Sequence, residues 1–174
     1  MSTLVEDLLL LARLDQAREM EDEPVDLKTL LHESVASAKA AGPDHPISLS
    51  MPDDELFVLG DSHRLHQVIS NLLANARTHT PVGTPISITA KQDDSGITIQ
   101  VSDQGPGLSV EDQTRIFERF YRADPSRVRN GGEGSGLGLS IVDAVMKAHG
   151  GKVSVTSELG KGATFTLFFP VKEN

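Results

Sequence analysis

Two asparagines, Asn71 and Asn75, stand four residues apart in a segment whose apolar residues recur at helical spacing. Asparagine is a poor residue for a helix interior because its side chain competes for backbone hydrogen bonds. At this spacing both amides lie on one side of a helix, and Mg²⁺ accepts neutral amide oxygens as ligands. The pair therefore predicts either a magnesium site or two amides that simply face water.

An acidic residue, Asp103, ends a run of alternating apolar residues and is followed by Gly105 and Gly107. A carboxylate in this position can accept a hydrogen bond from an exocyclic amine, and the glycines let a ligand approach the backbone closely. An ordinary Asp–Gly turn is the other interpretation of the same residues.

Arginine is concentrated in one stretch, because five of the nine arginines fall within fifteen residues of a chain whose formal net charge is −9. Phe117 and Phe120, about one helical turn apart, can anchor a segment whose arginines remain free to bind phosphate oxygens. A solvated basic loop would have the same composition. The five arginines are Arg115, Arg119, Arg122, Arg127 and Arg129.

Glycines crowd the start of a predicted helix over residues 136–149. Backbone N–H groups and the positive end of the helix dipole attract phosphate at such a start, although a flexible hinge is the alternative. The run is not a dinucleotide fingerprint, because Leu139 stands where the last glycine would be required.

Other patterns predict the elements that must position these residues. Helices are expected over residues 2–20, from Asp26 to about residue 41, and from Asp61 to about residue 77, with both aspartates as N-caps. The remaining runs alternate or are β-like, which predicts an α+β fold with helices on one face of a largely antiparallel sheet. The expected strands cover residues 47–51, 55–59, 86–90, 97–101, 152–157 and 163–169.

Composition excludes several classes. With 38% hydrophobic residues in 174, the chain fits one domain with a short appended element, and the absence of cysteine excludes disulfides and thiolate metal sites. The acidic charge argues against a general nucleic-acid binder. The longest apolar run covers only residues 8–12, so we expect no membrane contact by this segment and a cytoplasmic location.

Taken in order, the clusters are Asn-x-x-x-Asn, Asp-x-Gly-x-Gly, Phe-x-x-Phe, Gly-x-Gly-x-Gly and the run Gly160-Lys-Gly-Ala-Thr164-Phe. This series closely resembles the N box, first glycine box, F box, second glycine box and third glycine patch of the catalytic domain of sensor histidine kinases. The resemblance implies a two-layer α/β sandwich of the GHKL (Bergerat) ATPase type. It also implies that residues 23–174 form the catalytic ATP-binding domain and residues 1–22 the end of the second helix of a dimerisation domain.

The resemblance further implies ATP and Mg²⁺ as cofactors and a role for each motif residue. Asn75 would hold Mg²⁺ with Asn71 assisting, and Asp103 would bind the adenine amine. Residues 123–135 would form a mobile lid, with Arg122 reaching the terminal phosphate. The further residues implied at the nucleotide are Gly105, Gly107 and Thr164 around the base, and Gly134, Gly136, Leu137, Gly138 and His79 toward the phosphates.

Two departures from the family pattern bear on chemistry. Thr78 stands where the family often has a basic residue, and Arg77 is a candidate substitute. Hydrolysing relatives such as the Hsp90 and gyrase families carry glutamate at the position of Asn71, and a carboxamide cannot act as a general base. The pattern therefore favours phosphoryl transfer by a histidine kinase over ATP hydrolysis, with a non-catalytic nucleotide-binding module as a second alternative.

The histidine that such kinases phosphorylate is expected in a His-Glu-x-Arg-Thr-Pro setting, and only His32-Glu33 begins that way. We therefore expect a truncated kinase that does not phosphorylate itself. Its expected partners are a histidine-bearing dimerisation domain, a response regulator and a second copy bound through residues 2–20. The parent protein is expected to be an inner-membrane sensor with this domain on the cytoplasmic side.

Overall fold

A computed structural model describes residues 3–15, 21–42, 44–121 and 137–171. Its main layer is a five-stranded sheet of order β2-β4-β5-β7-β6, in which only the β2–β4 pair is parallel. The strands are β2 (Ile47–Ser50), β4 (Ile86–Asp93), β5 (Gly96–Asp103), β6 (Lys152–Ser157) and β7 (Ala163–Pro170). The predicted sheet of largely antiparallel strands is confirmed.

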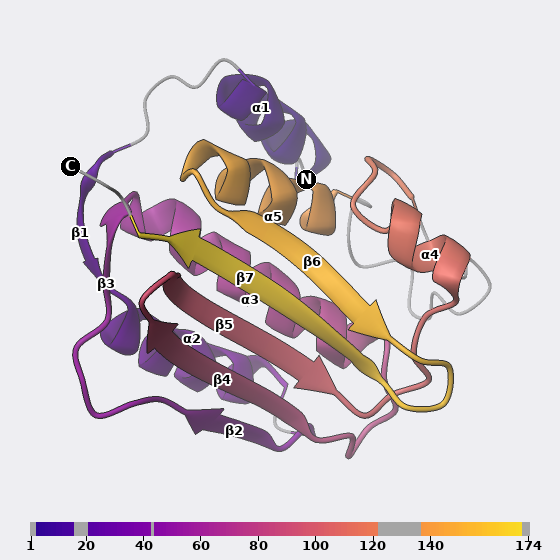
Figure 1. The fold of residues 1–174 in the computed structure, drawn as a ribbon. Coiled ribbons are helices and arrows are strands. Elements are labelled where there is room, and N and C mark those ends of the chain that lie inside the picture. The colour runs from indigo at the N-terminus through magenta and orange to yellow at the C-terminus, as the bar shows by residue number, and fades with distance from the viewer. Residues whose placement is uncertain (1–2, 16–20, 43, 122–136, 172–174) are drawn as a thin grey trace.

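Helices cover one face of this sheet, as Figure 1 shows. They are α2 (Leu27–Ala41), α3 (Ser62–Thr78) and α5 (Gly138–Ala148), and α1 (Thr3–Asp15) packs on the outer side of α5. Alternate strand residues such as Ile88, Ile99 and Leu167 are at most 1% exposed, so one face of each strand belongs to the core between sheet and helices. The predicted two-layer α/β sandwich is confirmed.

The predicted aspartate caps begin both helices. Asp26 accepts hydrogen bonds from the backbone N–H groups of Lys28 and Thr29, and the hydrogen bond from the Thr29 hydroxyl holds the pKa of Asp26 below its ordinary value. Asp61 accepts from the N–H of Arg64. These bonds satisfy N–H groups that lack partners in the first turn of a helix.

A buried histidine ties the start of α3 to the end of α5. The backbone N–H of Asp61 donates to Nε2 of His149 at 3.0 Å, and the ring's Nδ1 lies 2.8 Å from the carbonyl oxygen of Val145. Since Nε2 accepts, Nδ1 carries the ring proton and donates to Val145. His149 therefore joins two helices.

Two elements differ from expectation. The acidic stretch before Asp26 contains a strand, β1 (Glu23–Asp26), which pairs with β3 (Phe57–Gly60) as a separate antiparallel ribbon. A short helix, α4 (Val110–Arg115), begins at Ser109, whose side chain accepts from the N–H of Asp112. Neither element is among the helices and strands expected from the sequence.

Candidate nucleotide-binding site

Helix α3 carries both asparagines on a half-buried face. The adjoining stripe of the helix is buried, since Leu65, Val68 and Leu72 are at most 2% exposed. The Asn71 side-chain amide donates from Nδ2 to the carbonyl oxygen of Gly138 at 3.2 Å. This bond joins α3 to the first turn of α5, so the N-box helix and the end of the second glycine box lie together.

The start of α5 offers N–H groups without a side-chain cap. Leu137, the N-cap residue, is fully buried, and its carbonyl oxygen accepts from the N–H of Ile141 and from the Ser140 hydroxyl. No side chain of a described residue caps the helix start. Unpaired N–H groups and the helix dipole make this end suited to bind anions such as phosphates.

Asp103 is the last residue of β5, and its side chain lies on the helix-covered face of the sheet. It pairs with Ile86 on one side and Ala163 on the other, and both are buried. Its Oδ1 accepts from the N–H of Gly105 at 2.9 Å. Oδ2 makes no hydrogen bond with any residue that the structure describes, so an acceptor remains for a ligand donor.

The two glycines after Asp103 are required by close packing. A Cβ on Gly105 would stand 2.5 Å from Cγ2 of Thr80, and one on Gly107 would stand 2.3 Å from the carbonyl oxygen of Glu158. Gly107 also has φ of +78°, which favours glycine. Thr80, next to the end of α3, therefore forms one wall of this loop.

Two expectations change. Thr164 does not meet Asp103, because its hydroxyl lies 2.8 Å from that of Ser102 on the opposite face of the sheet. The residue of β7 that lies opposite Asp103, on the same face of the sheet, is Ala163. Arg77 does not substitute for the missing basic residue near the phosphates, because its Nη1 donates to the carbonyl oxygen of Ala38 on α2 at 2.9 Å.

The F-box segment is anchored by one phenylalanine. Phe117 packs edge-on against Phe165, with ring centroids 6.1 Å apart. Phe120 was expected to anchor as well, but it is 54% exposed and has φ of 65°, a conformation uncommon outside glycine.

The arginine that ends α4 is already paired. Arg115 forms an ion pair with Glu118 at 3.1 Å and stacks over the ring of Tyr121, so it does not remain free as expected. Its hydrogen bond holds the pKa of Glu118 below the ordinary value, and a hydrogen bond from the hydroxyl of Tyr121 to Asp112 raises the pKa of Tyr121. These contacts fasten the segment directly before residue 122 to α4.

The other implied residues divide into two groups. His79 ends α3 as its C-cap, and its N–H donates to the carbonyl oxygen of Asn75 at 3.0 Å. Arg122, Gly134, Gly136 and the expected lid over residues 123–135 lie outside the described residues.

Two amide oxygens fit a magnesium ion. The Nδ2 of Asn71 is used on Gly138, so its Oδ1 remains an acceptor, and the Asn75 side chain makes no hydrogen bond with any described residue. No group of three His, Cys, Asp or Glu side chains that could hold a metal occurs in the described part of the chain. An ion here would depend on one or two protein oxygens and on substrate phosphates, which is how proteins usually bind Mg²⁺.

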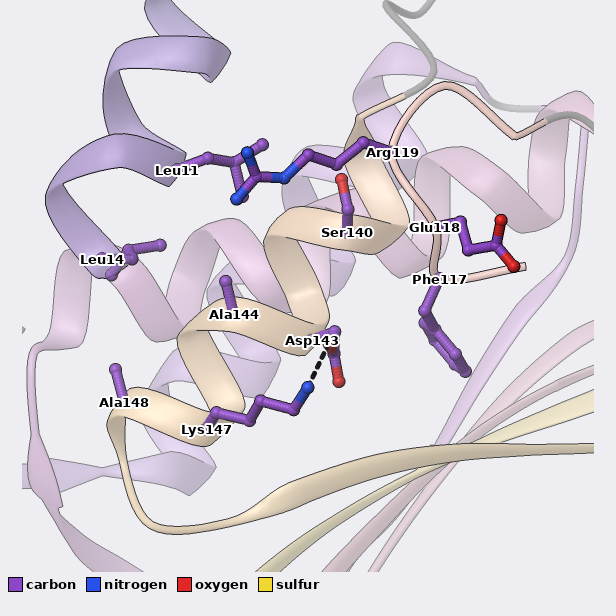
Figure 2. A pocket seen from close by; sticks show the side chains of 10 residues that line it. All are labelled: Leu11, Leu14, Phe117, Glu118, Arg119, Ser140, Asp143, Ala144, Lys147 and Ala148. Atoms are coloured by element: carbon purple, nitrogen blue, oxygen red, sulfur yellow. Dashed lines mark ion pairs between the residues drawn. The ribbon is translucent and has the colours of Figure 1, made fainter. Parts of the chain in front are cut away.

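A cavity of about 480 Å³ lies elsewhere, between α1, α5 and residues 117–119. Figure 2 shows Leu11 and Leu14 of α1 across from Ala144 and Ala148 of α5, with Lys147 paired to Asp143 at 2.9 Å. None of the implied nucleotide-binding residues lines this cavity, so it belongs to the contact of α1 with the rest of the domain.

Gly138 gives a test of the anion-binding end that separates binding from folding. Beyond its own helix, a Cβ on Gly138 would meet no atom of the described residues within 4 Å. Gly138→Ala therefore has room and should hold or raise stability by up to about 1 kcal/mol, because alanine favours a helix. We expect the same methyl group to lower ATP affinity about tenfold by standing where a phosphate approaches the N–H groups. Thermal unfolding and calorimetric titration measure the two effects, and unchanged ATP affinity would place the phosphates elsewhere.

A family model described as histidine kinase-, DNA gyrase B- and HSP90-like ATPase matches residues 60–173. The chain is 49% identical over 157 residues to the probable sensor histidine kinase TcrY of Mycobacterium tuberculosis, covering 90% of this chain and 33% of TcrY. It therefore spans about a third of the length of that curated relative. No described helix has both the length and the apolar content needed to cross a bilayer.

Solved structures agree with these sequence matches. The mycobacterial sensor histidine kinase MprB superposes with a TM-score of 0.74 at 30% identity, covering 86% of this chain and 97% of that one. Full-length ShkA in complex with AMPPNP superposes with a TM-score of 0.79 at 33% identity, covering 98% of this chain and 36% of ShkA.

Proposed function

The chain belongs to the histidine kinase-, DNA gyrase B- and HSP90-like ATPase family as a sensor histidine kinase catalytic domain, and from this premise we propose that it donates the γ-phosphoryl of Mg·ATP to a histidine on a dimerisation domain. The phosphoryl group would pass on to a response regulator. The observation that carries the proposal is the bond from Asn71 to Gly138, which sets the amide-bearing helix beside a helix start suited to phosphate.

The base end of the site would be Asp103. Its free Oδ2 accepts a hydrogen bond from the exocyclic amine of adenine, while Oδ1 stays bound to the N–H of Gly105. The complex of AMPPNP with the similar kinase ShkA supports an adenine nucleotide as the ligand. Gly105 and Gly107 keep side chains away from the base.

The phosphate end would be Asn71, Asn75 and the start of α5. Asn75 would hold Mg²⁺ with its amide oxygen, and Asn71 would assist from the preceding turn. The ion, when bound, neutralises charge on the triphosphate and stabilises the charge that develops during transfer. Arg122, Gly134, Gly136, Leu137, Gly138 and His79 are the further residues proposed around the phosphates.

The protein's part in the reaction is positioning. The chain supplies no nucleophile in this scheme: Asp103 fixes the base, α5 fixes the phosphates, and the acceptor histidine comes from another domain. A carboxamide at position 71 cannot remove a proton from water, so the site is unsuited to hydrolysis. The acceptor domain, and not water, should receive the phosphoryl group.

Residues 1–22 would be the end of a dimerisation-domain helix and residues 23–174 the catalytic domain. Helix α1 buries Leu10, Leu11 and Leu14, yet it exposes a second apolar face of Leu4, Val5, Leu8 and Leu9 that are each at least 39% exposed. Such a face needs a partner, and a helical bundle with a second copy would supply one. The parent would be a membrane sensor with this domain on the ATP-containing cytoplasmic side.

Incubation with radiolabelled ATP and Mg²⁺ tests the proposed reaction. We expect the chain to bind ATP without labelling itself, and to label a histidine-bearing dimerisation domain of the parent kinase when that domain is added. The label should be acid-labile and base-stable, as phosphohistidine is. Steady phosphate release without the acceptor would indicate a hydrolysing ATPase, and ATP binding without any transfer would indicate a non-catalytic module.

A further inference from the structure

His45 is buried, at 7% exposure, in a connection between α2 and β2. Its Nε2 lies 3.0 Å from the hydroxyl of Thr80, and that hydroxyl donates to the carbonyl oxygen of Ala76 at 2.7 Å. A hydroxyl has one hydrogen, and Thr80 uses it on Ala76. Nε2 of His45 therefore carries a proton and donates to Thr80, which fixes the side chain of Thr80 from two directions.

The methyl group of Thr80 lies on the other side, against the loop that follows Asp103. The space beside Gly105 is filled by that methyl, since a Cβ there would approach it to 2.5 Å. The N–H of Gly105 in turn holds Oδ1 of Asp103. Any shift of Thr80 would therefore be passed to the carboxylate through one buried glycine.

The connection that carries His45 is itself held on both sides. The carbonyl oxygen of Asp44 accepts from the N–H of Gly83 at 2.9 Å, and that of Pro46 accepts from the N–H of Ile86 at 2.8 Å. Ile86 is the cross-strand partner of Asp103. His45 is thus fixed relative to the strand end that presents the carboxylate, and it can serve as a rigid support.

We propose that His45 and Thr80 are positioning residues for recognition of the base. His45 fixes the Thr80 hydroxyl, the Thr80 methyl supports Gly105, and Gly105 sets the orientation of the Asp103 carboxylate. The inference rests on the proposed function, because it requires Asp103 to bind the adenine amine. Both residues act through Asp103 and need not touch the nucleotide.

The variant Thr80→Val keeps the shape and the methyl group but removes the hydroxyl. It leaves the Nε2–H of His45 and the carbonyl oxygen of Ala76 without their partner. We therefore expect the side chain at position 80 to lose its fixed orientation. ATP affinity, measured by calorimetry, should fall about tenfold, and the preference for ATP over GTP should fall with it. Affinity for inorganic tripolyphosphate, which has no base, should stay unchanged.

A matched control is Thr114→Val, because the Thr114 hydroxyl also donates to a backbone carbonyl, that of Glu111 at 2.7 Å, but at an exposed position. It should bind ATP as the wild type does. His45→Phe should reproduce the loss, and His45→Gln, whose amide can donate from a similar position, should restore it. The double variant His45→Phe/Thr80→Val should lose no more than either single one, because both remove the same contact.

Circular dichroism and thermal unfolding establish that each variant is folded at the temperature of the titration, and if Thr80→Val is unfolded the His45 pair carries the test. Unchanged ATP affinity and base preference in folded His45→Phe would overturn the proposal. An equal loss of tripolyphosphate affinity would also overturn it, since the effect would then be general loosening. Failure of the wild-type chain to bind ATP would instead contradict the proposed function.

Discussion

Replacing Asp103 with asparagine should lower ATP affinity about a hundredfold, the upper range for a charged hydrogen bond that is lost and replaced by a mismatch. The asparagine oxygen can still accept from the N–H of Gly105, so the loop keeps its geometry. Its Nδ2 takes the place of Oδ2 and presents a donor to the adenine amine, which is also a donor. Calorimetric titration with ATP and with tripolyphosphate measures the effect, and only ATP should respond.

The matched control is Asp94→Asn, which makes the same charge change in the exposed turn of the β4–β5 hairpin. This variant should bind ATP like the wild type, which shows that net charge alone does not set affinity. If Asp103→Asn binds ATP as tightly as the wild type, Asp103 does not recognise the base. It would also remove the basis for the roles of His45 and Thr80.

Local signals predicted much of the fold. The aspartate caps and the alternating apolar strands are each encoded by neighbouring residues, and the structure contains both. The strand β1 was missed because Pro24 and its acidic neighbours favour a linker. Its partner β3 also lies more than thirty residues away in the sequence, so no local pattern indicates the pairing. Proline is tolerated in β1 because β1 is an edge strand of a two-stranded ribbon.

The site was predicted less evenly, for physical reasons. Alternation along β5 puts Asp103 on the same face as Ile99 and Val101, and alternation along β7 puts Thr164 on the face opposite Phe165. The alternation of side chains along β7 therefore puts Thr164 on the face opposite Asp103, outside the expected base pocket. No local count would have found His45, because its burial depends on contacts with Thr80, thirty-five residues away.

Replacing Asn75 with leucine should remove most of the dependence of ATP affinity on Mg²⁺. Leucine has similar size and a higher helix propensity, so α3 should remain stable. Without the amide oxygen the ion loses its main protein ligand, because Asn71 only assists, and phosphoryl transfer to an added acceptor domain should slow by about a hundredfold or more. Titration with ATP in the presence of Mg²⁺ and of EDTA, together with the labelling assay, measures both effects.

Two comparisons separate loss of the ion from loss of the site. Asn75→Asp keeps an oxygen ligand and should retain binding that depends on Mg²⁺, whereas Asn75→Leu should bind ATP in EDTA as the wild type does. Gly138→Ala should be weaker than the wild type in both conditions, because its methyl group opposes the phosphates directly. If Asn75→Leu gains as much affinity from Mg²⁺ as the wild type does, the ion is held by another group and Asn75 is only a polar residue on the half-buried face of α3.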